Sequence, residues 1–266
     1  MILKPKYNFL KPFKTNTLKR YGRNFDGGYL VCENAIKSLD NSITLGVGDD
    51  ISFEKDIEKK KKIKNFYLYD HTINNYLFIK IIFKYLRRFL TFRTKLSNLI
   101  YSITNYFNFI NFIKKDNVFL YKKKVVSKKK NQNEIDLNQI FSNLNGNNNI
   151  LKIDIEGGEY LIIHDILKNF KKINTLIVEF HWINKNKDRF VNSIKKLKQK
   201  FDIIHLHANN YRPLKKNDDL FDVVEITMVN KKINKFRDEY RFSFPVKGLD
   251  YENFPNHKKI RFSFTK

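Results

Sequence analysis

Cysteine, glycine and proline are scarce in this chain, whose 266 residues include one cysteine, nine glycines and five prolines. The single cysteine, Cys32, cannot form an intramolecular disulfide, and no group of cysteine and histidine residues has the spacing of a zinc site. These absences exclude a disulfide-stapled scaffold and a zinc finger. They fit a reducing compartment, so we expect a cytoplasmic protein, with peripheral attachment to a membrane as the alternative.

The chain also lacks a long uninterrupted hydrophobic run. Residues 1–16 contain no apolar stretch long enough for a signal peptide. The longest uncharged run, residues 96–113, is interrupted by four Asn, two Ser and one Thr. A membrane-spanning helix needs ~20 predominantly apolar residues, so we expect this run to form a soluble or interfacial helix.

Acidic residues are few: 27 Asp and Glu stand against 52 Lys and Arg, which gives a formal net charge of +25. Such a surplus favours a polyanionic partner, which could be nucleic acid, anionic lipid or a phosphorylated substrate. The chain is equally crowded with Asn, Ile, Phe and Tyr, however, and AT-rich codons specify these residues and Lys alike. The charge is therefore either functional or compositional, and the sequence leaves both interpretations open.

The scarce glycines gather in short motifs, of which LGVGDDISFE at residues 45–54 is the first. Gly46, Gly48 and Asp49 follow an apolar, β-favouring run, and Asp70 ends the next expected strand. A strand, a glycine loop, a helix, a second strand and an acid open a nucleotide-binding βαβ unit. Glycine lets the loop approach a cofactor, and the acid can accept hydrogen bonds from ribose hydroxyls. This order suits both NAD and S-adenosylmethionine, although the full GxGxxG of a dinucleotide site is absent.

The second motif, LKIDIEGGEYLII, spans residues 151–163. Asp154 and Glu156 alternate with isoleucines at the end of an expected strand over 150–155, and this alternation puts both carboxylates on one face. Ligands of open α/β sheets bind beyond the carboxyl ends of the strands. We therefore expect both carboxylates at the functional site.

Polar side chains also lie in or near the ends of the later expected strands. These are Glu179, His181, His205, His207, Asn209, Asn210 and Glu225. Several polar side chains at one sheet edge favour a site, and His207 and Asn209 are the best candidates. A metal held by His207, Asp154 and Glu179 is conceivable, but the spacing does not demand it, and no metal is expected.

The order of elements predicts a single α/β domain over residues 1–266, with a Rossmann-like, mostly parallel sheet whose last strand is antiparallel. Residues 1–21 are basic, contain two prolines and are expected to be an irregular lead-in. Residues 76–117 interrupt the alternation of strands and helices and are expected to form a basic, aromatic helical insertion. Strands are expected at 42–47, 65–69, 150–155, 175–180, 202–207 and 222–229, and helices at 52–62, 136–144, 159–170 and 189–201.

Taken in order, these motifs resemble the FkbM-type methyltransferases over residues 22–72 and 118–229. The resemblance is carried by GRNFDGGYLV, LGVGDDISFE, YDHT, LKIDIEGGEY, VEFH and HLHANN, followed by a late EITMV. It implies a class I methyltransferase fold that uses S-adenosylmethionine to methylate oxygen, often on sugars of glycans or on secondary metabolites. The stretch 76–117 has no family motif, and the first loop is poorer in glycine than the family's commoner form.

The resemblance suggests roles for individual residues. Asp154 is the first candidate for the base or for the group that orients the acceptor, followed by His181 and His207, because the hydroxyl proton must leave as the new bond forms. The cofactor would be held by Gly46, Gly48, Asp49, Asp70 and Asp154. The acceptor pocket would contain Asp26, Tyr29, Glu156, Glu179 and Asn209.

Other functions remain as alternatives. An RNA or DNA methyltransferase shares the fold and fits the charge, but it would carry an Asn/Asp-Pro-Pro-Tyr type motif where DIEGGE stands, so nucleic acid is the less favoured partner. A non-enzymatic membrane or nucleic-acid binding module would explain 76–117 but not the carboxylate motifs. The insertion itself is either a cap packed on the sheet or a basic amphipathic helix that docks on an anionic membrane.

Overall fold

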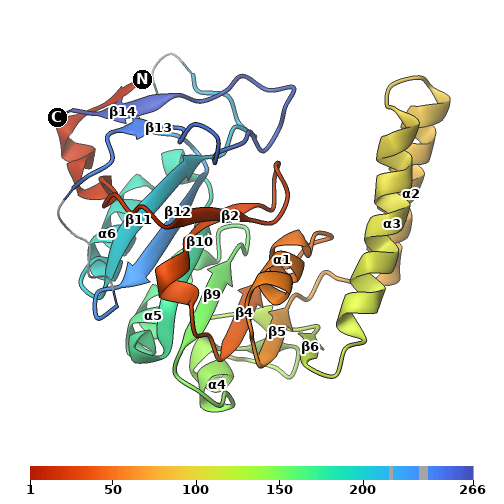
Figure 1. Ribbon diagram of the computed structural model, residues 1–266, viewed down its shortest axis with the longest axis horizontal. Coiled ribbons are helices and arrows are strands. Elements are labelled where there is room, and N and C mark those ends of the chain that lie inside the picture. The colour runs from red at the N-terminus through yellow and green to blue at the C-terminus, as the bar shows by residue number, and fades with distance from the viewer. Residues whose placement is uncertain (216–217, 234–238, 266) are drawn as a thin grey trace.

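The computed structural model describes residues 1–215, 218–233 and 239–265, and its centre is a seven-stranded sheet (Figure 1). The strand order is β11-β12-β10-β9-β4-β5-β6. Neighbouring strands are parallel, except that β12 is antiparallel to both β10 and β11. The strands are β4 (Asn41–Leu45), β5 (Asn65–Tyr69), β6 (Val118–Tyr121), β9 (Asn149–Ile153), β10 (Ile173–Phe180), β11 (Phe201–Ala208) and β12 (Val224–Asn230). The α/β class with a mostly parallel sheet is confirmed.

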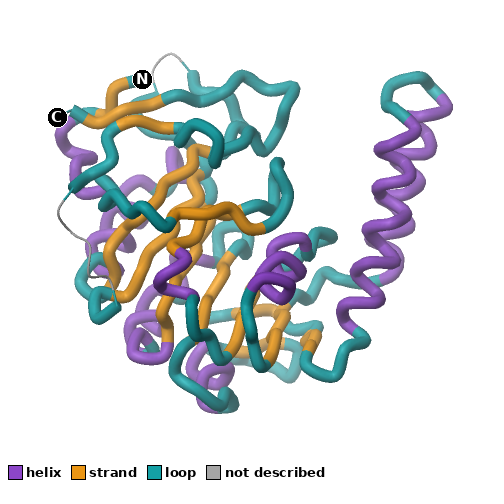
Figure 2. The backbone as a smooth tube through the Cα atoms, viewed as in Figure 1, coloured by secondary structure: helices purple, strands orange, loops and turns teal. Residues whose placement is uncertain are grey.

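Helices cover both faces of this sheet, which forms the central layer in Figure 2. Alternation along the strands supplies the two faces: Leu151 and Ile153 belong to one hydrophobic cluster, and Ile150 to another. The first cluster includes residues of α4 (Leu137–Ser142), α5 (Ile163–Lys168) and α6 (Lys187–Leu197). The second includes residues of α1 (Ser52–Lys60), of α3 (Leu96–Ile113) and of the hairpin of β2 (Leu18–Tyr21) and β3 (Tyr29–Cys32). Both faces of the sheet are therefore covered, so a ligand can reach the sheet only at the ends of the strands.

Local sequence signals locate several elements well. The strand expected at 65–69 is β5, with those bounds. The Asp136 side chain accepts a hydrogen bond from the Gln139 N–H at 2.9 Å and caps α4, as its sequence predicts. The helix expected over 159–170 is instead broken into η3 (Glu159–Leu161), α5 and the beginning of η4 (Phe170–Lys172). Shorter elements are η2 (Glu33–Ile36), η5 (Ile183–Lys185), β7 (Lys124–Val125) and β8 (Glu134–Ile135).

The first 21 residues are not irregular, which corrects that expectation. They contain β1 (Ile2–Leu3), η1 (Pro5–Leu10) and β2. β1 pairs with β14 (Phe262–Phe264), which pairs in turn with β13 (Ser243–Phe244), so the two ends of the chain meet (Figure 1). The physical reason is burial, because Leu3 and Leu10 are completely buried in the core and order the segment despite its prolines.

The insertion is a helical hairpin of α2 (Asn75–Leu90) and α3, which projects from the body of the protein (Figure 1). Asn74 caps α2 by accepting a hydrogen bond from the Leu77 N–H at 2.8 Å. Phe109 and Phe112 bury the end of α3 against the sheet, whereas α2 buries a single residue, Phe78. Within the described residues, no helix has the length and apolar character needed to cross a membrane.

Candidate active site

Two adjoining cavities open where the sheet strands reach their carboxyl ends. The larger cavity, of about 450 Å³, is lined by residues that follow β4, β5 and β9. The smaller cavity, of about 220 Å³, is lined by residues that follow β9, β10 and β11. Asp154, Glu156 and Trp182 line both. Two ligands, one in each cavity, would therefore meet at these three residues.

Gly46 brings the loop after β4 against the backbone of the loop after β9. Its φ is +77°, and a Cβ there would lie 1.6 Å from the carbonyl oxygen of Asp154. The N–H of Gly46 donates to the carbonyl oxygen of Tyr69 at 2.9 Å, and the Asp154 N–H donates to that of Leu45 at 2.8 Å. Only glycine fits this position, which forms part of the wall of the larger cavity.

Asp70 also lines the larger cavity, and its carboxylate fastens the same loop. Oδ2 accepts hydrogen bonds from the N–H groups of Val47 at 2.9 Å and Gly48 at 3.0 Å. Oδ1 accepts from the N–H and the hydroxyl of Thr72 at 2.7 and 2.6 Å. Burial alone would raise the pKa of Asp70, but the hydrogen bonds, led by that of the Thr72 side chain, outweigh it and hold the pKa below its usual value.

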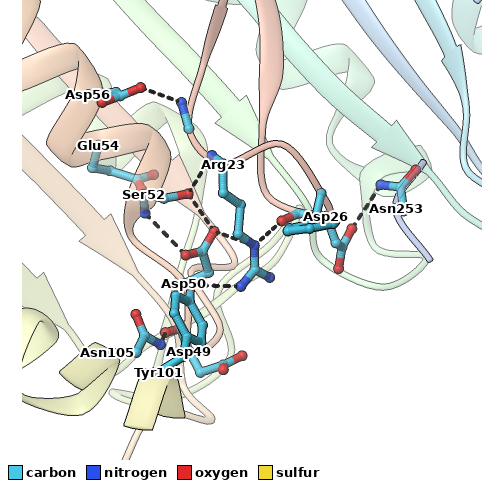
Figure 3. Close-up of polar contacts among 12 residues, drawn as sticks. Arg23, Asp26, Asp49, Asp50, Ser52, Glu54, Asp56, Tyr101, Asn105 and Asn253 are labelled. Atoms are coloured by element: carbon cyan, nitrogen blue, oxygen red, sulfur yellow. Dashed lines mark hydrogen bonds and ion pairs between the residues drawn. The ribbon is translucent and has the colours of Figure 1, made fainter. Parts of the chain in front are cut away.

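Gly48 and Asp49, both expected to hold a cofactor, line neither cavity. Gly48 acts through its N–H, which binds Asp70. The carbonyl oxygen of Asp49 accepts a hydrogen bond from the Asn105 side chain of α3 at 2.6 Å (Figure 3). Asp49 therefore connects the loop to the helical hairpin.

Three carboxylates surround one imidazole nitrogen in the smaller cavity. His181 Nε2 lies 3.6 Å from Asp154 Oδ1, 3.8 Å from Glu156 Oε2 and 3.8 Å from Glu179 Oε1. The side chain of His181 is 9% exposed and that of Glu179 is 6% exposed, whereas that of Glu156 is 76% exposed. The sequence predicted a site role for all four residues, and the fold brings them together.

A turn, and not strand alternation, brings Asp154 and Glu156 to one place. β9 ends at Ile153, and Glu156 and Gly157 have φ values of +51° and +95°. Glu159, a residue that sequence reasoning missed, holds this turn: Oε2 accepts from the Gly157 N–H at 2.8 Å, and Oε1 accepts from the His181 N–H at 2.7 Å. The sequence feature that could have identified Glu159 is an acid directly after two glycines.

Two further expected acceptor residues lie in the smaller cavity, and one does not. Asp26 and Asn209 line it, and the Asn209 amide donates to Glu179 Oε1 at 2.8 Å. Tyr29 is buried outside both cavities, with its ring edge-on to Phe53 at 5.5 Å. Its place within β3 turns the side chain into the hydrophobic core.

The loop that carries Asp26 is tied to its surroundings by Arg23 (Figure 3). The Arg23 side chain donates to the carbonyl oxygen of Asp26 and, at 3.0 Å, to the hydroxyl of Tyr101 on α3. Its Nε lies 3.5 Å from Asp50 Oδ2. Asn253 donates to Asp26 Oδ1 at 2.9 Å from the opposite side. The hairpin and the C-terminal segment thus both help to position this acid.

His207 is not part of either cavity, which corrects its expected place beside Asp154. It lines a separate cavity of about 10 Å³, where Nε2 contacts Asn253 Oδ1 at 2.8 Å and Nδ1 lies 3.3 Å from Asp250 Oδ1. Burial alone would lower its pKa, but Glu225 and Asp250 outweigh burial and raise the pKa to about 9. The segment around Asp250, distant in sequence, encloses this histidine.

The site carries an excess of acidic groups. Burial raises the pKa of Asp154 to about 6, against the opposing effect of Lys152 and His181. Burial and the neighbouring Asp154 raise the pKa of Glu179 well above its usual value. Lys152, also missed, lies buried in β9 with Nζ 3.9 Å from Glu54 Oε1. The sequence feature that could have identified Lys152 is a lysine among apolar residues of an expected strand.

Comparison with known proteins identifies the class. The sequence profile described as the Methyltransferase FkbM domain matches residues 15–213. The chain belongs to the FkbM methyltransferase family. It is an S-adenosylmethionine-dependent methyltransferase, and S-adenosylmethionine is its cofactor. No curated protein matches the chain.

The chain also resembles several solved structures, and three of them follow. A fibrillarin/Nop5p complex shares 12% identity over 80% of this chain and 91% of that chain, with a TM-score of 0.38. Spermidine synthase from Thermotoga maritima shares 8% identity over 78% of this chain and 62% of that chain, with a TM-score of 0.45. Precorrin-6y C5,15-methyltransferase from Geobacter metallireducens GS-15 shares 11% identity over 74% of this chain and 85% of that chain, with a TM-score of 0.37.

Proposed function

We propose that this enzyme transfers the methyl group of S-adenosylmethionine to a sugar hydroxyl in a glycan or a related metabolite. The C–O bond forms as the C–S bond of the sulfonium breaks, the cofactor leaves as S-adenosylhomocysteine, and the hydroxyl proton passes to a base. The observation that carries the proposal is that Asp154 and Glu156 line both cavities. A donor in the larger cavity and an acceptor in the smaller one would meet beside them.

The larger cavity suits the cofactor. It lies at the carboxyl ends of β4 and β5, where open α/β sheets bind nucleotides. Gly46, Asp70 and Asp154 line it and are the proposed cofactor residues, and Gly48 contributes by holding Asp70. The acceptor positions of Asp70 are filled by donors of Val47, Gly48 and Thr72, so Asp70 would support the cofactor through the loop that it organises.

The smaller cavity suits a sugar. Sugars present hydroxyl groups at their rim and apolar C–H groups on their faces, so they need both polar and flat apolar partners. The polar lining includes Asp26, Glu156, Glu179 and Asn209, and the aromatic lining includes Trp182, Tyr211 and Phe254. Carboxylates accept hydrogen bonds from hydroxyls, which would orient one oxygen toward the methyl group.

The proposed base is the pair of Asp154 and His181. Asp154 Oδ1 and His181 Nε2 are 3.6 Å apart, and both line the smaller cavity. The pKa of Asp154 is raised by burial to about 6, which is close to the working pH of a general base. His207 is not proposed for this role, because it lies outside the cavity.

A methyl-transfer assay with labelled cofactor over separate glycan, lipid-linked sugar and RNA extracts tests the function. Label in a sugar-containing product that resists alkaline hydrolysis, as a methyl ether does, would support O-methylation of a hydroxyl. Label in RNA alone would overturn it in favour of the alternative that the +25 charge raises. Heat-inactivated enzyme and the Asp154→Asn variant are the controls.

We also propose that the helical hairpin docks the enzyme on an anionic membrane near a lipid-linked acceptor. Its exposed apolar side chains include Ile79, Phe83, Leu90, Phe92 and Leu96, and Phe92 at the tip is 98% exposed. Exposed cations flank them, namely Lys80, Lys84, Arg87, Arg88, Arg93 and Lys95. This combination is typical of interfacial helices, whose apolar face enters the headgroup region while the cations contact anionic lipid.

A further inference from the structure

We propose that Asp154, Glu156 and His181 bind a divalent metal cation at the boundary between the two cavities. This inference deepens the proposed function, since it adds a cation to the same site, but metal binding can be measured without any acceptor. It also differs from the metal set that the sequence suggested, because His181 stands in place of His207, which lines another cavity, and Glu156 stands in place of Glu179.

The distances are those of ligands around a common ion. One donor atom from each of the three residues lies within 4.8 Å of the others. Nε2 of His181 is 3.6 Å from Asp154 Oδ1 and 3.8 Å from Glu156 Oε2, which is too long for hydrogen bonds. Two ligands that are each ~2.1 Å from one metal stand ~3–4 Å apart. The three side chains thus leave a space between them that a cation fills.

His181 supplies a second, independent observation. Its side chain is only 9% exposed, and its buried Nδ1 has no hydrogen-bond partner among the described residues. Nε2 faces the carboxylates of Asp154 and Glu156 at 3.6 and 3.8 Å. Nδ1, on the other edge of the ring, faces Glu159 Oε1 at 3.5 Å. Metal-binding histidines are oriented in this way, with a carboxylate behind the ring and the free nitrogen toward the ion.

The charge of the smaller cavity favours a cation. Four of its lining residues are acids, namely Asp26, Asp154, Glu156 and Glu179. Among the described residues, the guanidinium in its lining belongs to Arg212, which forms an ion pair with Asp222 at 3.0 Å. Carboxylates brought together in a partly dry cavity repel one another unless a cation offsets them. Carboxylate oxygens suit Mg²⁺ and Mn²⁺, and imidazole suits transition metals, so Mn²⁺ satisfies both donor types.

The position of the cation gives it a role in the transfer. Asp154 and Glu156 line both cavities, whereas His181 lines the smaller one, so the ion would sit on the acceptor side of the boundary. Coordination positions left open by the protein could take neighbouring oxygens of a sugar. A bound hydroxyl loses its proton more readily, and its oxygen is held toward the methyl donor. Asp154 would then bind the ion through one carboxylate oxygen and accept the hydroxyl proton on the other.

Manganese binding to the full-length protein tests the inference. The electron paramagnetic resonance signal of free Mn²⁺ is titrated with wild-type protein and with the Glu156→Gln and His181→Gln variants. We expect one Mn²⁺ per chain in the wild type and a dissociation constant about tenfold higher or more in each variant. Glu156→Gln is the cleaner variant for folding, because its side chain is 76% exposed.

Two matched controls separate this site from adventitious binding. Glu239→Gln removes an exposed carboxylate and His164→Gln an exposed imidazole, and neither residue lines the cavities. Both should bind Mn²⁺ as the wild type does. Absence of binding at millimolar Mn²⁺, or equal binding by all variants, would overturn the inference. If methyl transfer to sugar fails while Mn²⁺ binding still depends on Glu156 and His181, the acceptor assignment fails and the metal site stands.

Discussion

Asp70 accepts a hydrogen bond from the backbone N–H of Gly48 at 3.0 Å, and this contact joins the end of β5 to the loop after β4. Together with Val47 and Thr72, it occupies both carboxylate oxygens with two donors each. A carboxylate offers about four acceptor positions. Asp70 therefore acts on the cofactor site through the loop that it shapes, so its removal should affect cofactor affinity and loop order together.

The Asp70→Ala variant should bind S-adenosylmethionine more weakly by ~1–3 kcal/mol, the scale of hydrogen bonds to a charged group. Calorimetric titration measures this change. Asp49→Ala is the matched control, because Asp49 lies in the same loop but lines neither cavity, and its affinity should stay close to that of the wild type. Equal affinities for wild type and Asp70→Ala would remove Asp70 from the cofactor site.

Asp154→Asn should lower turnover by a factor of ~10²–10⁴ while cofactor affinity changes little. The reason is that the carboxylate lies between the two cavities, where a base or a metal ligand must act. Single-turnover kinetics and calorimetry separate the two effects. Full activity in this variant would transfer the chemical role to His181 or Glu179.

Gly46→Ala should destabilise the protein far more than Gly48→Ala. Both positions have positive φ, +77° and +62°, so both variants incur a backbone cost of ~1 kcal/mol. A Cβ at Gly46 also meets the Asp154 carbonyl oxygen at 1.6 Å, whereas no atom of the described residues lies within 4 Å of a Cβ at Gly48. Urea denaturation compares the two free energies of unfolding. Similar values would show that the two loops are not in contact as described.

The protein should become less stable as the pH rises above neutrality, because His207 then loses the proton that stabilises the folded state. The pKa of His207 is raised from 6.5 to about 9 in the folded state, so its contribution is fully present below ~pH 6.5 and is lost as the pH rises through 9. The upper bound is ~3 kcal/mol. Urea denaturation between pH 6 and 9.5 should show this decline in the wild type and in His164→Gln, an exposed-histidine control, but a smaller one in His207→Gln. Identical slopes in all three proteins would contradict the assignment.

The hairpin should carry the protein onto vesicles that contain phosphatidylserine, and raising the salt concentration should weaken the attachment. The Phe92→Asn variant should bind less, and its asparagine tolerates the φ of +55° at this position. Ile2→Ser removes an apolar side chain that is 70% exposed at the N-terminus and is the control. Vesicle flotation at low salt makes the comparison. If wild-type protein floats with neither neutral nor anionic vesicles, the hairpin has another role.

Residues close together in the sequence were enough to predict several elements of this protein. The apolar run NFYLY, closed by Asp70, specifies β5, and Asp136 specifies the beginning of α4, because strand periodicity and capping depend on residues close in sequence. The order of the glycine and carboxylate motifs likewise indicates the family without reference to the fold. The helical character of the insertion followed from its spacing, but its projection from the body did not.

Tertiary structure decided what the active site contains. His181 directly follows β10, and His207 lies near the end of β11. His181 faces the shared boundary of two cavities, whereas His207 is enclosed by Asp250 and Asn253, more than 40 residues further along the chain. Alternation could not place Glu156 either, because β9 ends first and a turn with positive φ carries it to His181. Burial and turn geometry depend on contacts between distant segments, and no local pattern encodes which segment covers which side chain.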